Sequence, residues 1–225
     1  MDNILLIETS TALCSVALAQ DGAITSYRES SAPKAHASLT AVFIQEMLAE
    51  RGLTLADCDA VCVSKGPGSY TGLRVGVSTA KGLCFGSGKP LLAVGTLDTL
   101  VAQAETPNDF RYIIPMIDAR RMEVYTAVSE NGVQVTETAP MIIDETSFAE
   151  YLEQGPCLFI GDGAGKCADV IKHPNAQFCQ CCPKASAMLE PAMKAYKEKR
   201  FEDVAYFEPF YLKEFVATVS KKKLW

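Results

Sequence analysis

Two segments rich in glycine and hydroxyl-bearing residues have the composition of loops that hold a phosphate group. Glu8-Thr9-Ser10-Thr11 follows a short apolar run, and Lys65–Gly72 (KGPGSYTG) leads from another apolar run into a helical pattern. Backbone N–H groups in such turns, and at the start of the helix that follows, attract anions. The alternatives are a Ser/Thr-rich turn that bonds its own backbone and a tight strand–helix connection. A Walker loop is excluded, because no Gly-Lys-Ser/Thr follows at the required spacing.

Residues for other kinds of chemistry are scarce. The two histidines, His36 and His173, lie far apart in the sequence, which argues against a histidine-based zinc site. Cys179-Gln180-Cys181-Cys182 offers three thiols, but adjacent cysteines make poor chelates and no second cluster accompanies them. Gly161–Gly165 lacks the full dinucleotide fingerprint, so an ordinary loop is favoured. For Asp118–Arg121, between two predicted strands, a charged hairpin turn is favoured.

A row of small residues recurs at four-residue spacing in the second predicted helix. Gly72, Gly76 and Ala80 would lie on one face of that helix. Each glycine inside a helix costs about 1 kcal/mol relative to alanine, so close packing must offset the cost. That packing is either against the chain's own sheet or against a helix of a partner, and the sequence leaves both alternatives open.

The elements that would position these residues form a mixed α/β pattern. Three short strands joined by tight turns are followed by alternating helices and strands, which is not a plain βα array. The predicted strands are Ile4–Ile7, Cys14–Ala19, Ile24–Glu29, Ala60–Val63, Leu91–Val94, Tyr112–Ile117, Met122–Val128, Val133–Thr138 and Leu158–Ile160. The predicted helices are Ser38–Glu50, Leu73–Phe85, Leu97–Ala104, Ser147–Gln154, Lys166–Lys172 and Ser186–Arg200.

Length and composition predict a globular chain with one large domain or two small lobes. The chain has 225 residues, 48% of them apolar, and a net charge of −6. The Thr-Pro-Asn-Asp stretch at Glu105–Asp109 is the predicted lobe boundary. An acidic chain does not favour a long phosphate-tracking groove, although Lys221, Lys222 and Lys223 form a basic end. An odd count of nine scattered cysteines is typical of free thiols in a reducing compartment.

Taken in order along the chain, three segments resemble one family. They are Ile4–Thr11 (ILLIETST), Ser64–Gly76 with its continuation Ala80–Gly82, and Ile117–Arg120 followed by Glu123–Tyr125. These segments are similar to the opening strand and turn, the long central motif and the second-lobe hairpin of the TsaB (YeaZ) family. That family is a bacterial subunit needed to make threonylcarbamoyladenosine (t6A) on tRNA. The central motif is specific, and the resemblance is clearest over residues 4–128.

The resemblance implies a two-lobed actin-like ATPase fold with mixed sheets, the class that includes sugar kinases, Hsp70 and ribonuclease H-like proteins. The lobes would be residues 1–105 and 106–225, with the last helices packing back on the first lobe. It implies a cytoplasmic, non-catalytic subunit of the t6A transferase that binds and stabilises a catalytic paralogue, TsaD. The implied further partners are the ATPase TsaE, tRNA indirectly through the complex, and a second copy of the chain when TsaD is absent. The apolar runs of the sequence are too short for a membrane span, which agrees with this expectation.

The resemblance also implies roles for particular residues. The paralogue binds a metal through two histidines, and the matching positions here are Thr96 and Leu100, so no metal and no catalytic residue is expected in this chain. The family commonly has Asp at the position of Glu8, so only weak nucleotide binding is expected, with ATP or ADP at a subunit interface and no required cofactor. The nucleotide residues would be Thr9, Ser10, Thr11, Gly66, Gly68 and Ser69. The partner interface would use Leu39, Phe43, Met47, Gly72, Leu73, Val75, Gly76, Thr79, Ala80 and Leu83.

Two other functions are kept as alternatives. One is an independent small-molecule kinase or ATPase of the same fold, which ATP turnover by the purified chain would reveal. The other is a glycoprotease-like peptidase, which a casein or self-cleavage assay would reveal. The region after residue 105 is short for a kinase substrate domain, and no peptidase nucleophile or metal set can be assembled from the sequence.

Overall fold

Five strands form the first sheet. In this computed structural model, which describes residues 2–213, β1 (Asn3–Glu8), β2 (Cys14–Gln20) and β3 (Ala23–Ser30) make an antiparallel meander. Two further strands, β4 (Ala60–Gly66) and β5 (Leu91–Gly95), run parallel to β1 on its other side. The strand order is β3-β2-β1-β4-β5, so β1 lies at the centre. The predicted three-strand meander is confirmed.

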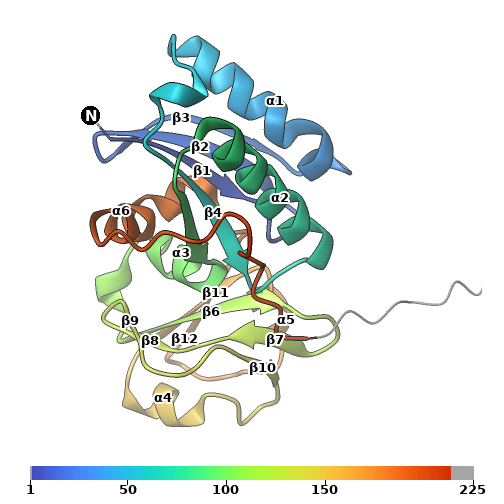
Figure 1. Cartoon of the computed structure of the whole chain (residues 1–225). Helices are drawn as coiled ribbons and strands as arrows, with labels where there is room; N and C mark the ends of the chain where they lie inside the picture. Colours follow the sequence, from blue (N-terminus) through green and yellow to red (C-terminus); the bar gives the residue numbers. More distant parts are fainter. Residues whose placement is uncertain (1, 214–225) are drawn as a thin grey trace, which may run out of the picture.

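Helices cover both faces of this sheet (Figure 1). Alternate residues of a strand point to opposite faces, and here both faces are apolar. Leu5, Ile7, Val61 and Val63 pack on one side with α1 (Ala35–Glu50) and α2 (Tyr70–Ser87). Ile4, Leu6, Ala60 and Cys62 pack on the other side with η3 (Ala185–Met188) and α6 (Leu189–Lys197). The central strands are therefore buried on both faces.

The second sheet follows residue 111. Its main path is β10 (Ala139–Ile142), β7 (Glu123–Thr126), β6 (Tyr112–Asp118), β11 (Cys157–Gly161) and β12 (Ala176–Gln180). The short strands β8 (Ser129–Glu130) and β9 (Val133–Gln134) join at β6, and the predicted Asn131-Gly132 turn connects them. The remaining short elements are η1 (Leu55–Asp57), α3 (Thr96–Ala102), η2 (Pro107–Asp109), α4 (Ala149–Gln154) and α5 (Ala164–Cys167). Helix α3 packs on the second sheet through Leu97 and Leu100.

Several predicted element bounds were wrong. Helix α1 begins at Ala35, because Lys34 takes the left-handed cap conformation, and Ser38 lies inside the helix with its hydroxyl donating to the Lys34 carbonyl. The single predicted helix 186–200 is η3 followed by α6, with Pro191 in the first turn of α6, where its missing N–H costs nothing. Helix α5 ends at Cys167 instead of Lys172. Strands β10 and β12 were missed, because none of their residues is fully buried.

The chain after α6 crosses from the first sheet to the second. We call residues 198–213 the C-terminal strap. Glu202 N donates to Leu91 O over 2.8 Å, Phe210 N donates to Lys65 O over 2.7 Å, and Lys213 forms an ion pair with Glu123. The predicted basic end, Lys221–Lys223, lies outside the described residues. Within residues 2–213, no helix is long and apolar enough to cross a membrane.

Candidate functional site

The two turns predicted to hold a phosphate lie against each other. Ser69 N donates to Ser10 O over 2.6 Å, and Thr9 Oγ1 donates to Gly72 O over 2.9 Å. Both contacts join the turn after β1 to the start of α2, whose N-cap is Ser69. The structure thus brings Thr9 and Ser10 together with Gly68 and Ser69, which are about sixty residues later in the sequence.

Glycine is required on the α2 side of this contact. A Cβ on Gly68 would lie 2.3 Å from Ser10 O, and one on Gly72 would lie 2.1 Å from Thr9 O. A Cβ on Gly76 would lie 2.2 Å from Thr9 Oγ1. These distances are far inside van der Waals contact. The small residues therefore let α2 approach the turn after β1 of the same chain.

This packing corrects part of the predicted partner interface. Gly72, Gly76 and Ala80 are buried inside the first lobe, so the row is internal packing and offers no surface to a partner. Met47 and Leu73 are also fully buried in the chain's own core. The error arose because a row of small residues indicates that another backbone packs closely, but not whether that backbone belongs to the same chain or to a partner. Leu39, Phe43, Val75, Thr79 and Leu83 are half-buried, and their interface role stays a prediction.

The turn after β1 fits a phosphate group poorly. Ser10 N donates to Glu8 Oε1 over 2.6 Å, and Gly72 N donates to Ser69 Oγ. With Ser69 N also bonded to Ser10 O, three of the backbone donors that a phosphate cradle would use are already engaged. Three buried oxygens, Glu8 Oε2, Ser10 Oγ and Thr11 Oγ1, have no partner among the described residues. The two hydroxyls can donate to an anion, but the neighbouring carboxyl opposes it when ionised.

The Glu8 carboxyl is held in an unusual environment. Burial raises its pKa to about 7, and the hydrogen bond from Ser10 N only partly opposes that shift. A buried carboxyl that keeps its proton near neutral pH loses the repulsion that it would otherwise exert on an anion. The state of Glu8 therefore controls the charge of the whole turn.

We expect this carboxyl to make the stability of the fold pH-dependent. The folded state holds the Glu8 proton up to about pH 7, whereas the unfolded chain releases it near the ordinary value of 4.5. Its contribution is therefore complete below pH 4.5 and falls, by about 3 kcal/mol in total, as pH rises to 7. Urea denaturation of the wild type and Glu8→Gln from pH 4.5 to 8 measures this difference. Parallel stability curves for the two proteins would contradict the assignment.

Thr96 and Leu100, the two positions from which the resemblance predicted that this chain binds no metal, are used for packing. Thr96 Oγ1 lies 2.9 Å from Ser64 Oγ, with both side chains buried, and Leu100 is fully buried beside β6. Among the described residues, no group of three or more His, Cys, Asp or Glu side chains is placed to hold a metal ion.

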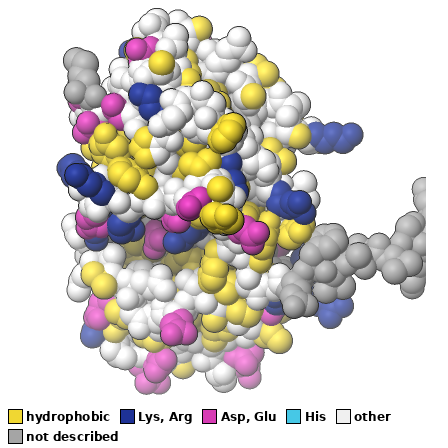
Figure 2. Space-filling view, viewed as in Figure 1, with side chains coloured by type: hydrophobic (Ala, Val, Ile, Leu, Met, Phe, Trp, Pro, Cys, Tyr) yellow, Lys and Arg dark blue, Asp and Glu magenta, His cyan; other side chains and the backbone are white. Residues whose placement is uncertain are grey.

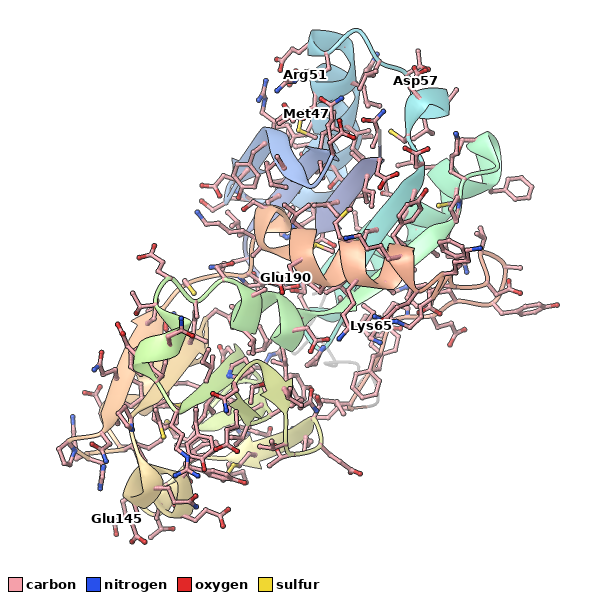
Figure 3. The ribbon with its side chains drawn as sticks, turned by 90° about the vertical axis from the view of Figure 1, so that its left-hand side faces the viewer. Met47, Arg51, Asp57, Lys65, Glu145 and Glu190 are labelled. Atoms are coloured by element: carbon pink, nitrogen blue, oxygen red, sulfur yellow. The ribbon has the colours of Figure 1, made fainter. Side chains whose placement is uncertain are left out.

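A groove that was not predicted from the sequence runs between the two lobes. It comprises two adjoining cavities of about 590 and 820 Å³ that share Lys65, Gly95, Asp98 and Gln134. Figure 2 shows basic and acidic side chains side by side along this hollow, and Figure 3 places Lys65 and Glu190 where the lobes meet. The groove lies at the carboxyl ends of the parallel strands β4 and β5. Ligands bind at such strand ends in open α/β sheets, so the predicted strands could have located the groove. Gly66 lines the second cavity, but Thr9, Ser10 and Thr11 line neither.

The outward side of α1 and α2 carries exposed apolar groups. Val42 is 42% exposed and Phe85 is 87% exposed, although both belong to helices whose inner faces are core. Gly82 and Gly86 also lie on this side, and a Cβ on either would meet nothing within 4 Å. We call Val42, Gly82, Phe85 and Gly86, with the half-buried Leu39, Phe43, Val75, Thr79 and Leu83, the outer face. The predicted interface residues did not include its four exposed members.

Comparisons with known proteins agree on one family. The family model for TsaD, tRNA N6-adenosine threonylcarbamoyltransferase, matches residues 29–221. The TsaB proteins of Escherichia coli and Haemophilus influenzae, described as tRNA threonylcarbamoyladenosine biosynthesis proteins, are 32% and 30% identical to this chain. Those alignments cover 95% and 98% of this chain, and 96% of each relative.

Solved structures confirm the two-lobed actin-like fold expected from the resemblance. YeaZ from Pseudomonas aeruginosa superposes with a TM-score of 0.81 at 27% identity, covering 94% of this chain and all of that one. The activator of a 2-hydroxyisocaproyl-CoA dehydratase from Clostridium difficile, solved with bound ADPNP, gives a TM-score of 0.50 at 10% identity. That match covers 88% of this chain and 96% of the activator, and at such low identity it shows the fold alone.

Proposed function

Because this chain belongs to the TsaB (YeaZ) family of t6A biosynthesis proteins, we propose that it is a non-catalytic subunit that binds and stabilises a TsaD-like paralogue. The paralogue transfers the threonylcarbamoyl group to tRNA in the cytoplasm. This chain contributes a binding surface and no reacting group.

The outer face is the observation that carries the proposal. Gly82 and Gly86 weaken α2 by about 1 kcal/mol each, and nothing inside the described chain offsets that cost. An aromatic side chain that is 87% exposed, at Phe85, lies between them in the helix. A second helix packed across the outer face would bury Phe85 and approach the two glycines closely. Such packing would remove the apolar surface of Phe85 from water and offset the helix-weakening effect of the glycines.

Two positions support the proposal that the transfer reaction takes place in the paralogue and not in this chain. The Thr96 hydroxyl is bonded to the Ser64 hydroxyl, and the Leu100 side chain is packed in the core and has no atom that can bind a metal. The metal and the transfer reaction belong to the paralogue under this proposal.

Other members of the assembly follow from the same proposal. The outer face pairs with a second copy when the paralogue is absent, since one self-complementary patch suffices for a two-fold dimer. A TsaE-like ATPase joins the larger complex, and ATP or ADP binds at a subunit interface. The engaged amides beside Ser10 support weak binding of any nucleotide by this chain alone.

We expect the purified chain to carry far less than one zinc or iron ion per molecule. Elemental analysis measures this directly, with the TsaD-like paralogue prepared in parallel as the positive control. A stoichiometric ion bound near residues 96–100 would contradict the assignment of those positions to packing.

The test of the proposed function is reconstitution. Transfer by the paralogue should depend on this chain, while this chain alone should neither turn over ATP nor modify tRNA. Robust ATP turnover by the chain alone would favour an independent ATPase or kinase of the same fold instead.

A further inference from the structure

Three of the nine cysteines lie together at the end of β12 and are not used by the proposed function. Cys179 is exposed, and Cys181 and Cys182 are half-buried. The other six cysteines are buried in the two lobes, and burial raises the pKa of each of their thiols. A thiol reacts as its thiolate and only where a reagent can reach it. The thiols of this chain that are most open to reaction are therefore those at the end of β12.

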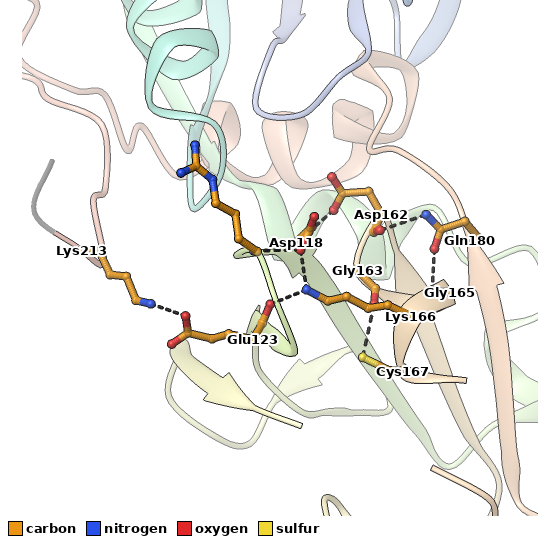
Figure 4. A network of polar contacts seen from close by, with 10 residues as sticks. Asp118, Glu123, Asp162, Gly163, Gly165, Lys166, Cys167, Gln180 and Lys213 are labelled. Atoms are coloured by element: carbon orange, nitrogen blue, oxygen red, sulfur yellow. Dashed lines mark hydrogen bonds and ion pairs between the residues drawn. The ribbon is translucent and has the colours of Figure 1, made fainter. Parts of the chain in front are cut away.

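The residue between the first two of these thiols points away from them. Gln180 directs its side chain toward α5, where its Oε1 accepts a hydrogen bond from Gly165 N over 2.6 Å and its Nε2 donates to Asp162 O over 2.9 Å (Figure 4). Successive side chains of a strand point to opposite faces of the sheet. Cys179 and Cys181, on either side of Gln180, therefore share the face that is turned away from α5.

The pairing of β12 with β11 confirms this placement. Cys179 lies in register with Ile160, which belongs to the apolar cluster that packs against α3. Cys181 N donates to Gly161 O over 3.3 Å, which extends the pairing by one residue, and the Cys181 side chain packs on the same cluster. Burial, together with the neighbouring Cys179 thiol, raises the pKa of Cys181 to about 12. The two thiols thus lie side by side, one exposed and one protected.

The chain that follows these thiols connects the two lobes. We call residues 181–184 the crossover segment, because they lead from β12 in the second lobe to η3, which packs on the first sheet. Gln103, at the end of α3, holds this segment on both sides of its amide group. Its Nε2 donates to Cys182 O over 3.0 Å, and its Oε1 accepts from Lys184 N over 2.9 Å. A change in the backbone at Cys181 therefore acts directly on a connection between the lobes.

We propose that Cys179 and Cys181 form a reversible disulfide when a hydroperoxide oxidises them, and that this bond loosens the crossover segment. The exposed Cys179 thiolate attacks the peroxide and breaks its O–O bond, which leaves a sulfenic acid on Cys179. The hydroxide that leaves takes up the proton that Cys179 had released. The Cys181 sulfur then attacks the Cys179 sulfur, the S–OH bond breaks, and water leaves with the Cys181 proton. With hydrogen peroxide, the two thiols lose two electrons and two protons, and the peroxide becomes two molecules of water.

Closing this bond requires the end of β12 to move. Cα atoms two residues apart in a strand are separated by about 6.6–6.8 Å, whereas disulfides join Cα atoms that are about 4.4–6.8 Å apart. The bond therefore draws Cys181 toward Cys179 and away from Gly161 O, and the hydrogen bond of 3.3 Å breaks. The loop that closes is too short to gain much stability from chain entropy. We expect oxidation to release the crossover segment from Gln103 as well.

The test treats the purified full-length chain with hydrogen peroxide, alkylates it in denaturant, and analyses tryptic peptides by mass spectrometry. All three thiols fall in the peptide 173–184, so a disulfide leaves one alkylated cysteine there instead of three. Cys179→Ser and Cys181→Ser should each abolish the disulfide, whereas Cys182→Ser, the matched control, should retain it. In Cys181→Ser, dimedone should trap a sulfenic acid on Cys179, and dithiothreitol should return the oxidised wild type to three alkylated cysteines.

Hydrogen exchange followed by NMR tests the effect on the crossover segment. The amides of Cys181 and Lys184 should exchange roughly tenfold faster in the oxidised chain, because both lose their acceptors, while amides of β1 should be unchanged. Three alkylated cysteines after peroxide treatment, or a disulfide that persists in Cys179→Ser, would overturn the assignment of this pair. Unchanged exchange at Cys181 and Lys184 in the oxidised chain would overturn the loosening of the crossover segment. None of these measurements involves the paralogue, so their outcome is independent of the proposed function.

Discussion

Gly76→Ala should destabilise the protein by about 2–3 kcal/mol, although alanine is the better helix former. The new Cβ would lie 2.2 Å from Thr9 Oγ1, a hydroxyl that is buried and already donates to Gly72 O. Relieving the overlap requires breaking that hydrogen bond or moving α2 off the turn after β1, and overpacking of this kind outweighs the gain of about 1 kcal/mol in helix propensity. Urea denaturation with circular dichroism gives the free energy of unfolding.

Gly82→Ala is the matched control for this substitution. It is the same change in the same helix, but a Cβ at Gly82 meets nothing within 4 Å, so the variant should gain about 1 kcal/mol. The two variants therefore separate close packing from helix propensity. If Gly76→Ala were as stable as the wild type, the close contact between α2 and Thr9 would not exist in solution.

Phe85→Ala should weaken binding of the TsaD-like paralogue by 30-fold or more while leaving the fold unchanged. The side chain is 87% exposed, so its loss removes little from the core of the monomer. An aromatic group that becomes buried at the centre of an interface is typically worth about 2–4 kcal/mol, which gives that loss of affinity. Isothermal titration calorimetry with the purified paralogue measures the dissociation constant.

Two further variants sharpen this result. Tyr206→Ala removes an equally large aromatic group, 84% exposed, from the C-terminal strap, and should leave the affinity unchanged. Gly82→Arg adds bulk where the partner helix would approach, and should be as damaging as Phe85→Ala. If the Phe85→Ala and Gly82→Arg variants both bound the paralogue with wild-type affinity, the interface would lie outside the outer face.

The first lobe could be predicted from the sequence because its signals are local and strong. Apolar runs at Ile4–Ile7 and Ala60–Val63, and the turn at Asp21-Gly22, define central strands and a hairpin directly. Strands β10 and β12 could not be found in this way, because none of their residues is fully buried and neither carries the apolar run of a core strand. Their formation depends on pairing with β7 and β11, which is a long-range contact.

The same limit explains the errors at the site. The sequence indicated that Gly72 and Gly76 need a close neighbour, but it could not say that the neighbour is Thr9, more than sixty residues earlier. Conversely, Gly82 and Phe85 were not singled out as interface residues, because only the folded structure shows that both lie exposed on the surface. Both turns predicted for a phosphate exist, yet three of their backbone donors are engaged: Ser10 N and Gly72 N bond within their own turns, and Ser69 N bonds across to Ser10 O.

We propose above all that this chain supports a TsaD-like transferase through its outer face and carries out no chemistry itself. The most direct measurement is t6A formation on an unmodified tRNA transcript by the paralogue, supplied with threonylcarbamoyl-adenylate, as this chain is titrated in. We predict that modification rises with the wild-type chain and saturates near equimolar ratio. Modification should be lower with the Phe85→Ala variant, because that variant binds the paralogue more weakly. Modification should not occur with this chain alone. Modification by the paralogue that is equally fast without this chain, or modification by this chain alone, would contradict the account.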